Sequence, residues 1–294
     1  MLKLYIPKAT PVYQTQEKKK VDQVSDLGKF QKLSEGFKRG PNYRMKRLDV
    51  ILGVSVWLVS GDKIRGTKKR PGIDVDFTCG GHGYRYLYIP LNEIWIDGGL
   101  KREDVRPTIW HEFTERHLME RGWDYNKAHD YAARVEIGIR DGEEFVLPVT
   151  NYTQSNGYAC GAVALRIVLE YLALELTEKE LMKLANTTPA TGTDPKNMVA
   201  AAHKLGFEVQ HKEGWTPNQV KKTLENGLPI IANYQESPEE GEGHYAVIIG
   251  YTKDEFIFSN PSKGEDFTLI KVADFMERWH ELEDDTKQEG IVIS

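Results

Sequence analysis

The pattern of hydrophobic and polar positions divides the first half of the chain into short apolar runs followed by two amphipathic stretches. Residues 48–58 (LDVILGVSVWL) predict a buried strand. Three shorter runs predict further strands, at residues 73–77, 84–90 and 93–97. The stretch CGGHG (79–83) predicts a tight connection between two of these strands. Residues 1–47 are polar and basic, and they predict a partly ordered arm.

Two helices are predicted after these strands. The first spans residues 102–120 and the second spans residues 125–138. Gly122 marks the end of the first helix, and the side chain of Asp124 can cap the second. Because the turn between them is short, we expect the two helices to pack as an antiparallel hairpin.

The second half of the chain places helices first and strands afterwards. An apolar stripe predicts a helix over residues 159–174, and Thr177 with Glu180 forms a capping box for the next one. Two more helices follow, one opened by Asp194-Pro195 and closed by Gly206, and one over residues 216–227. Alternating runs then predict four strands, at residues 229–234, 244–251, 255–260 and 267–272. Helices followed by an antiparallel sheet indicate an α+β fold.

Composition and charge limit the classes of function that the protein can have. The 294 residues are enough for two ordinary domains. A net charge of −5 argues against nucleic acid as the main partner, because phosphate binding needs a basic surface. We expect a cytoplasmic protein, because the chain starts without a signal-peptide core and carries no apolar run of membrane-spanning length. Its two cysteines are expected to be reduced thiols.

One of these cysteines stands where a helix is predicted to begin. Cys160 lies in QSNGYACGA (154–162), immediately before the apolar helical run. A helix N-terminus lowers the pKa of a thiol, and the thiolate is the nucleophilic form. Gln154, six residues earlier, could donate its amide to a developing oxyanion beside the backbone N–H of Cys160.

Two later residues can complete this site. His244 opens a predicted strand, and Asn260 ends the next one. Adjacent antiparallel strands can bring the two side chains into contact, so that Asn260 orients the imidazole. A cysteine, a histidine and an asparagine with an upstream glutamine form the papain-type arrangement.

These residues resemble those of a known family. Residues 147–290 resemble the papain-like cysteine peptidases that remove double-glycine leader peptides from bacteriocins, and their stand-alone relatives. The resemblance rests on the stretch around Cys160 and on residues 191–207, 227–234, 244–251 and 259–261. It implies Cys160 as nucleophile, His244 as general base and acid, Asn260 as orienting residue and Gln154 in the oxyanion hole, with no cofactor. Many relatives carry Asp where this chain has Asn260.

A second group of candidate residues lies on the predicted helical hairpin. The sequence HEFTE (111–115) resembles the H-E-x-x-H motif of zinc peptidases, with Glu115 in place of the second histidine. Helical spacing places His111 and Glu115 on one face of the first helix, and His129 and Glu136 on one face of the second. The hairpin can bring the four together as ligands of zinc or another divalent metal, including iron, manganese or a bridged metal pair. Glu112 would be the base.

Three further features of the first half suggest other properties. Its strands and hairpin resemble uncharacterised proteins encoded by phages and prophages. Cys79 and His82 could ligate a metal. The glycine pairs Gly80-Gly81 and Gly98-Gly99 could be cleaved by the second half of the chain, although such pairs usually mark turns.

Taken together, the sequence predicts three segments and a peptidase. Residues 1–47 form the arm, residues 48–142 an α+β domain that ends in the hairpin, and residues 147–294 the papain-like domain. We expect a thiol peptidase or isopeptidase acting on a peptide or protein substrate. The alternatives are a metal-dependent hydrolase whose second half binds peptides, and a non-catalytic, virion-associated component of a phage-like particle. Cys160 could also be a buried structural thiol. Oligomeric state is left open.

Overall fold

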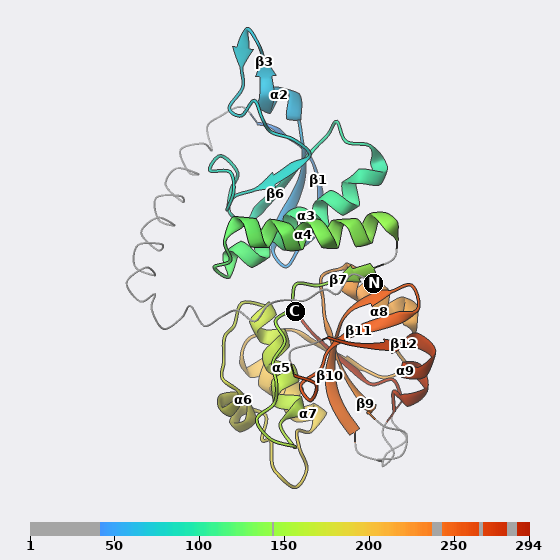
Figure 1. Ribbon diagram of the computed structural model, residues 1–294. Coiled ribbons are helices and arrows are strands. Elements are labelled where there is room, and N and C mark those ends of the chain that lie inside the picture. Colours follow the sequence, from blue (N-terminus) through green and yellow to red (C-terminus); the bar gives the residue numbers. More distant parts are fainter. Residues whose placement is uncertain (1–41, 143, 237–242, 265–266, 281–286) are drawn as a thin grey trace. The chain divides into compact units, whose positions relative to one another are not determined.

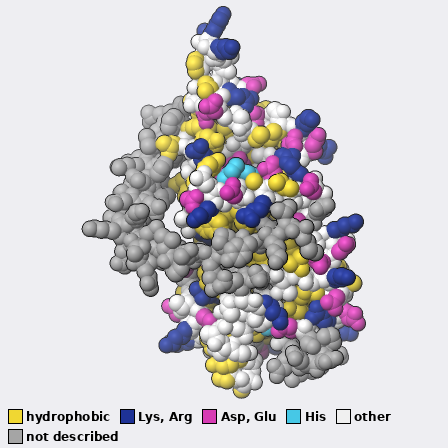
Figure 2. Space-filling model, viewed as in Figure 1, with side chains coloured by type: hydrophobic (Ala, Val, Ile, Leu, Met, Phe, Trp, Pro, Cys, Tyr) yellow, Lys and Arg dark blue, Asp and Glu magenta, His cyan; other side chains and the backbone are white. Residues whose placement is uncertain are grey.

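The protein is seen here in a computed structural model, which describes residues 42–142, 144–236, 243–264, 267–280 and 287–294 (Figure 1). Most of the segment predicted as an arm lies outside these residues, although its last part already belongs to the first strand. The described residues form two compact units that divide after Gly142. On the described part of the face drawn in Figure 2, basic and acidic side chains are interspersed.

The N-terminal unit is a small mixed sheet with two long helices. Its elements are β1 (Arg44–Ile51), β2 (Val54–Val59), α2 (Gly61–Arg65), β3 (Gly66–Thr67), β4 (Arg70–Pro71), β5 (Gly80–His82), β6 (Glu93–Asp97), α3 (Arg102–Glu120) and α4 (Tyr125–Asp141). The main sheet has the order β1-β2-β6-β5, in which only the β2–β6 pairing is parallel. Helix α3 contacts β5 and β6 on one side and α4 on the other.

The helical hairpin was predicted correctly. Helix α3 covers the predicted residues, and α4 extends to Asp141, three residues beyond the predicted end. The side chain of Asp124 accepts a hydrogen bond from the backbone N–H of Lys127, as expected of an N-cap. Gly122 has a φ of +86°, which suits the reversal between the helices.

Other predictions for this unit were wrong. Residues 48–58 do not form one strand, because the chain reverses at Leu52 and Gly53, which both have positive φ. Residues 73–77 and 84–90 contain no strand, and residues 80–82 of the predicted connection are strand β5.

Aromatic packing explains the course of residues 84–90. Tyr86 and Tyr88 pack with Phe77 and Trp95 in the core of the unit, while the backbone turns, with the N–H of Tyr86 bonded to the carbonyl of His82. A Cβ on Gly81 would lie 2.6 Å from the Tyr86 ring. The glycine therefore lets β5 pass close to these rings, and periodicity alone could not reveal this.

The C-terminal unit combines helices with an antiparallel sheet. Its elements are β7 (Glu144–Val146), α5 (Cys160–Tyr171), α6 (Glu178–Leu184), α7 (Pro195–Lys204), β8 (Val209–Lys212), α8 (Pro217–Glu225), β9 (Ile230–Gln235), β10 (Gly243–Thr252), β11 (Glu255–Ser259), β12 (Thr268–Lys271), α9 (Val272–Arg278) and β13 (Gly290–Ile293). The sheet has the order β12-β11-β10-β9-β13-β8, with β7 also paired to β10. The predicted α+β class is confirmed.

Strand β10 lies at the centre of this sheet. Its first residues pair with β9, its later residues pair with β11, and its last three pair with β7. Helix α5, which is buried on most of its surface, packs against β9 and β10, and α6 and α7 pack on α5 (Figure 1). The four predicted helices and four predicted strands are present, whereas β7, β8, β13 and α9 were not predicted.

The capping box of Thr177 and Glu180 is formed at the start of α6. No helix in the described ranges combines the length and the apolar character that crossing a membrane requires.

Replacement of Gly250 by alanine should destabilise the C-terminal unit. A Cβ at this position would lie 2.4 Å from the Phe145 carbonyl oxygen, where β10 and β7 pair. Because the clash is with backbone, we expect Gly250→Ala to lower the free energy of unfolding by roughly 1–3 kcal/mol in urea denaturation. Gly157→Ala is the control, because its Cβ would meet no atom within 4 Å. Equal stability of the two variants would contradict the packing argument.

Candidate functional site

Cys160 is the first residue of α5, as predicted. The N-cap residue Ala159 supplies no side-chain hydrogen bond to the helix end. The backbone N–H groups of Gly161 and Tyr245 bond the sulfur, and His244 lies beside it. The thiol is therefore partly buried at the positive end of a helix, surrounded by hydrogen-bond donors.

His244 and Asn260 come together as the strand order requires. His244 lies near the start of β10, and Asn260 immediately follows β11, its antiparallel neighbour. The Nε2 atom of His244 lies 2.7 Å from Oδ1 of Asn260, and the Asn260 side chain is fully buried. The two residues are therefore in contact, as the sequence predicted.

A neighbouring residue fixes which atom of Asn260 faces the imidazole. The backbone N–H of Ser262 donates to Oδ1 of Asn260 at 2.9 Å, so this atom must be the amide oxygen. The Nδ2 of Asn260 donates to the hydroxyl of Tyr234 at 3.3 Å. Because Oδ1 can only accept, Nε2 of His244 must carry a proton. In the neutral ring, the lone pair then lies on Nδ1, on the side of Cys160.

The thiol and the imidazole shift each other's pKa in the sense that an ion pair requires. Burial raises the pKa of Cys160, but His244 and the two backbone N–H groups outweigh burial and leave the pKa lowered. Burial lowers the pKa of His244, but Cys160, Asn260 and Glu236 outweigh burial and leave it raised. The arrangement thus favours a thiolate beside an imidazolium.

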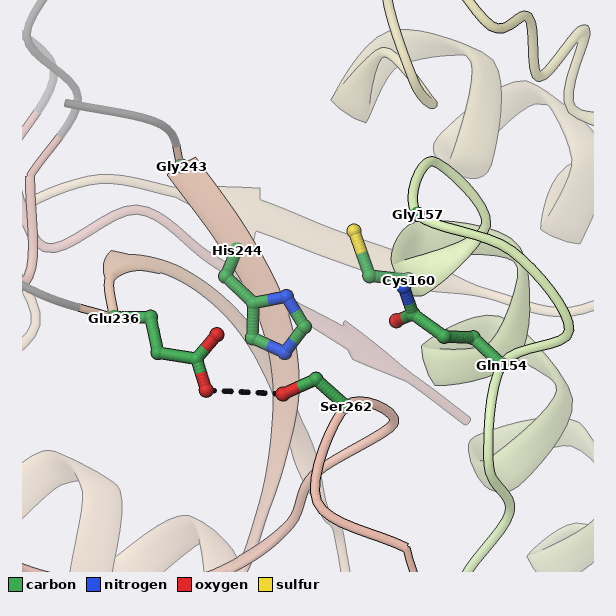
Figure 3. A pocket seen from close by; sticks show the side chains of 7 residues that line it. All are labelled: Gln154, Gly157, Cys160, Glu236, Gly243, His244 and Ser262. Atoms are coloured by element: carbon green, nitrogen blue, oxygen red, sulfur yellow. Dashed lines mark hydrogen bonds between the residues drawn. The ribbon is translucent and has the colours of Figure 1, made fainter. Parts of the chain in front are cut away.

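These side chains open onto one pocket of about 390 Å³. Its lining residues are Gln154, Gly157, Cys160, Glu236, Gly243, His244 and Ser262. Figure 3 shows Cys160 and Gln154 on one wall, Glu236 and Ser262 on the other, and the ring of His244 between them. The pocket is lined mainly by polar side chains, and the partly buried thiol of Cys160 is one of them.

Gln154 lies in the pocket where an oxyanion donor is expected. Its Nε2 donates one hydrogen bond to the backbone carbonyl of Asn156 at 2.8 Å, which leaves the second N–H of the amide for another acceptor. Its backbone N–H donates to the carbonyl of Pro261 at 3.0 Å. This bond ties the segment before α5 to the turn that follows Asn260.

Sequence reasoning missed two residues that contact Asn260: Ser262, which also lines the pocket, and Tyr234. The hydroxyl of Ser262 lies 2.9 Å from Oε1 of Glu236 and 3.0 Å from Oδ1 of Asn260. Lys263 also contacts Glu236, at 2.8 Å. Tyr234 was inside a predicted strand, and only the register of β9 against β10 places it opposite His244. No local motif in the sequence marks Ser262 or Tyr234.

The acidic loop before His244 is only partly described. Glu239, Glu240 and Glu242 lie outside the described residues. Glu236, at the end of the segment that precedes them, lines the pocket.

The residues predicted to bind metal form a second cluster, in the N-terminal unit. His111, Glu115 and His129 lie together, with His111 Nε2 3.2 Å from His129 Nδ1 and Glu115 Oε2 2.7 Å from the same His129 atom. Glu136 contacts the other ring nitrogen of His111, at 2.7 Å. The structure therefore brings three of the four predicted ligands to one point and places Glu136 behind His111.

His82 joins this cluster from β5. Its Nε2 lies 2.9 Å from Oε1 of Glu115, and with Glu112 and Glu115 it forms a second group of ligand-type atoms. Cys79 belongs to neither group among the described residues. The sequence marked His82 as a possible ligand, but it could not show that β5 packs against α3 at the height of Glu115.

The pKa values of several side chains in this cluster are strongly shifted. Burial disfavours the charged ring of His111, but Glu115 and Glu136 outweigh it and raise the pKa of His111 to about 10. Burial, together with Glu115 and Glu136, raises the pKa of Glu112 to about 8 although His111 opposes it. Burial lowers the pKa of His82, despite its bond to Glu115.

Several solved structures are similar to this chain. One is the peptidase domain of Streptococcus ComA, a bifunctional ABC transporter of a quorum-sensing pathway, with 23% identity over 49% of this chain and 97% of that domain, at a TM-score of 0.40. A double-glycine-motif protease from an AMS/PCAT transporter, in complex with the leader peptide, shares 18% identity over 50% of this chain and 92% of its own, at 0.39.

A C39-like peptidase from Bacillus anthracis is 14% identical over 52% of this chain and 98% of its own, at a TM-score of 0.39. No curated protein matches the chain. None of these matches extends the family resemblance to the N-terminal half, whose resemblance to phage and prophage proteins stays a prediction.

The sequence of the C-terminal half matches a family model directly. Residues 149–282 match the peptidase C39 family, and this range contains Gln154, Cys160, His244 and Asn260. The match supports a cysteine peptidase. The predicted resemblance of the C-terminal half to the papain-like C39 peptidases, and the papain-like fold predicted with it, are therefore confirmed.

Proposed function

We propose that the C-terminal unit is a cysteine peptidase that cleaves a peptide or isopeptide bond, with Cys160, His244 and Asn260 as its catalytic triad. The observation that carries the proposal is the buried bond from His244 Nε2 to Asn260 Oδ1. This bond leaves Nδ1 of the imidazole to take the proton of the Cys160 thiol. The family match supports the reaction class.

In the proposed reaction, His244 transfers protons while Cys160 attacks the substrate. His244 removes the thiol proton, and the Cys160 thiolate attacks the carbonyl carbon of the substrate to form a tetrahedral oxyanion. The second N–H of Gln154 and the backbone N–H of Cys160 would stabilise that oxyanion. The imidazolium then protonates the leaving amine, which departs and leaves a thioester on Cys160. Water, deprotonated by His244, hydrolyses the thioester and restores the thiol.

Asn260 and Glu236 adjust the imidazole in this scheme. The neutral amide of Asn260 orients the ring through Oδ1, in the place where a charged aspartate would also raise the pKa of the histidine. Glu236 faces the ring from the other wall and contributes to the raised pKa of His244. We infer that Glu236 supplies part of the negative charge that Asn260 lacks.

The reactivity of the thiol should follow the proposed ion pair. In a Cys79→Ser background, Cys160 is the only cysteine left, and its rate of alkylation by iodoacetamide reports the thiolate. The thiolate forms as pH rises through the pKa of Cys160, so we expect the midpoint of the rate below that of a free thiol. His244→Ala should move the midpoint upward. Identical midpoints in both proteins would contradict the pairing.

Cleavage should depend on the four site residues to different degrees. In a peptide-library digest, Cys160→Ala should abolish cleavage without unfolding the protein, and His244→Ala should be equally damaging because the imidazole moves the proton. Asn260→Ala should cost less, and Gln154→Ala should slow turnover by roughly 10²–10³, the scale of one oxyanion donor. Cys79→Ala is the control and should cleave normally. Undiminished cleavage by Cys160→Ala would rule out this nucleophile.

Glu236 should contribute to substrate choice. The acidic loop at residues 235–243 predicts a preference for basic or glycine-flanked peptides, and Glu236 reaches the pocket. We expect lysine-containing peptides to be cleaved faster than glutamate-containing ones at low salt, with the preference reduced by Glu236→Gln and by added salt. Lys263→Gln is the paired control and should strengthen the preference. Cleavage rates that do not depend on peptide charge or on flanking glycines would exclude selection by this loop.

A further inference from the structure

The proposed peptidase leaves the histidine and carboxylate cluster of the N-terminal unit without a role. Three of its donor atoms converge from α3 and α4: Nε2 of His111, Oε2 of Glu115 and Nδ1 of His129. Their separations are 3.2 Å between the two ring nitrogens, 2.7 Å from Glu115 to His129, and 3.6 Å from Glu115 to His111. All three side chains therefore direct a metal-ligating atom at the same small volume.

We propose that His111, Glu115 and His129 bind one divalent transition-metal ion, for which zinc is the best match. Zinc bonds nitrogen and oxygen at about 2.0–2.2 Å in a tetrahedron, which separates neighbouring ligand atoms by roughly 3.3 Å. The three observed separations lie on either side of this value. Two imidazoles and one carboxylate form a ligand set that leaves a fourth position for water or another ligand.

Hydrogen bonds alone cannot satisfy the three ligand atoms of His111, Glu115 and His129. Nδ1 of His129 has two neighbours at bonding distance, a carboxylate oxygen and a ring nitrogen. That atom carries either one proton or one lone pair, so it can fully satisfy only one neighbour. A cation between the three atoms satisfies all of them at once, because each offers a lone pair.

Glu136 holds His111 in the required orientation. Its Oε2 lies 2.7 Å from Nδ1 of His111, and its Oε1 accepts from the guanidinium of Arg140 at 2.7 and 2.9 Å. Metal-bound histidines commonly have a carboxylate beside their second ring nitrogen. Glu136 is therefore a positioning residue in this proposal, rather than the fourth ligand that the sequence predicted.

His82 performs a similar task for Glu115. This histidine is fully buried on β5, and its Nε2 contacts Oε1 of Glu115 at 2.9 Å. With one carboxylate oxygen anchored, the other is left for the metal. In the described part of the chain, the ion pairs of Glu115 are all with histidines, which are themselves ligand-type side chains.

The site is accessible from solvent. The side chain of His129 is 43% exposed, whereas that of Glu115 is 4% exposed. Figure 2 shows histidine side chains that reach the surface next to acidic ones. Glu112, which follows His111 in the chain, lies with His82 and Glu115 in the second group of ligand-type atoms and would stand near the open position.

The test is a direct count of bound metal on the full chain. After treatment with a chelator, the protein is titrated with zinc, and the bound metal is measured by mass spectrometry after gel filtration and by calorimetry. We expect one zinc per chain and a higher melting temperature with zinc than without it. His129→Ala is the main variant, because its exposed ring can be removed without opening the core, and it should lower affinity at least 100-fold.

Further variants separate ligands from positioning residues. Glu115→Gln should also abolish tight binding, whereas Glu136→Gln should lower affinity by roughly 10–100-fold and keep one zinc per chain. Cys79→Ser is the matched control and should bind zinc like the wild type, because this nearby thiol is in neither ligand group. Cys160→Ala should also bind normally, which separates this proposal from the peptidase.

Three results would overturn the proposal: no zinc bound, binding unchanged in His129→Ala, or binding lost in Cys79→Ser. Two zinc ions per chain would overturn the single-ion assignment in favour of a pair bridged by Glu115. Circular dichroism establishes that each variant is folded.

Discussion

The hydrogen bond between His244 and Asn260 depends on the pairing of two strands, and the geometry of the pocket depends on that bond. His244 lies near the start of β10, and Asn260 follows the end of β11. In an antiparallel pair these two positions lie at the same end of the sheet, so the contact follows from register. A slip of one residue would turn the imidazole to the other face of the sheet.

The loops around the pocket preserve this register. The backbone bond from Gln154 to Pro261 fixes the segment before α5 against the turn that carries Asn260. The N–H and the hydroxyl of Ser262 contact the same Oδ1 atom that accepts from His244. The nucleophile end and the histidine end of the site are therefore connected by main-chain bonds, and their separation does not depend on side-chain packing alone.

The sequence allowed the helices and most central strands of the C-terminal unit to be predicted, because their apolar periodicity is strong and their caps are explicit. It also allowed the four candidate site residues to be chosen, because Cys160 stands at a helix start and His244 and Asn260 stand at strand ends. Ser262 and Glu236 were harder to assign, because their contacts come from the folding of loops whose residues carry no periodic pattern. Short strands such as β8 and β13 left little signal for the same reason.

In the N-terminal unit, the residues with local spacing were predicted better than those brought together by tertiary packing. His111 and Glu115 are one helical turn apart, and a short turn brings His129 opposite them, so sequence spacing was sufficient. His82 depends on β5 passing beneath α3, which its neighbouring glycines permit: a Cβ on Gly80 would lie 3.0 Å from the Glu112 side chain.

The two clusters follow one physical rule, which is that the partner of one ring nitrogen decides what the other can do. Asn260 bonds Nε2 of His244 and leaves Nδ1 for the thiol, whereas Glu136 lies beside Nδ1 of His111, and Nε2 of that ring faces Glu115 and His129. The neighbours of the free nitrogen then differ. A thiol beside it can give up a proton, which favours acid–base chemistry. A second imidazole and a carboxylate offer further lone pairs instead, which favours a cation.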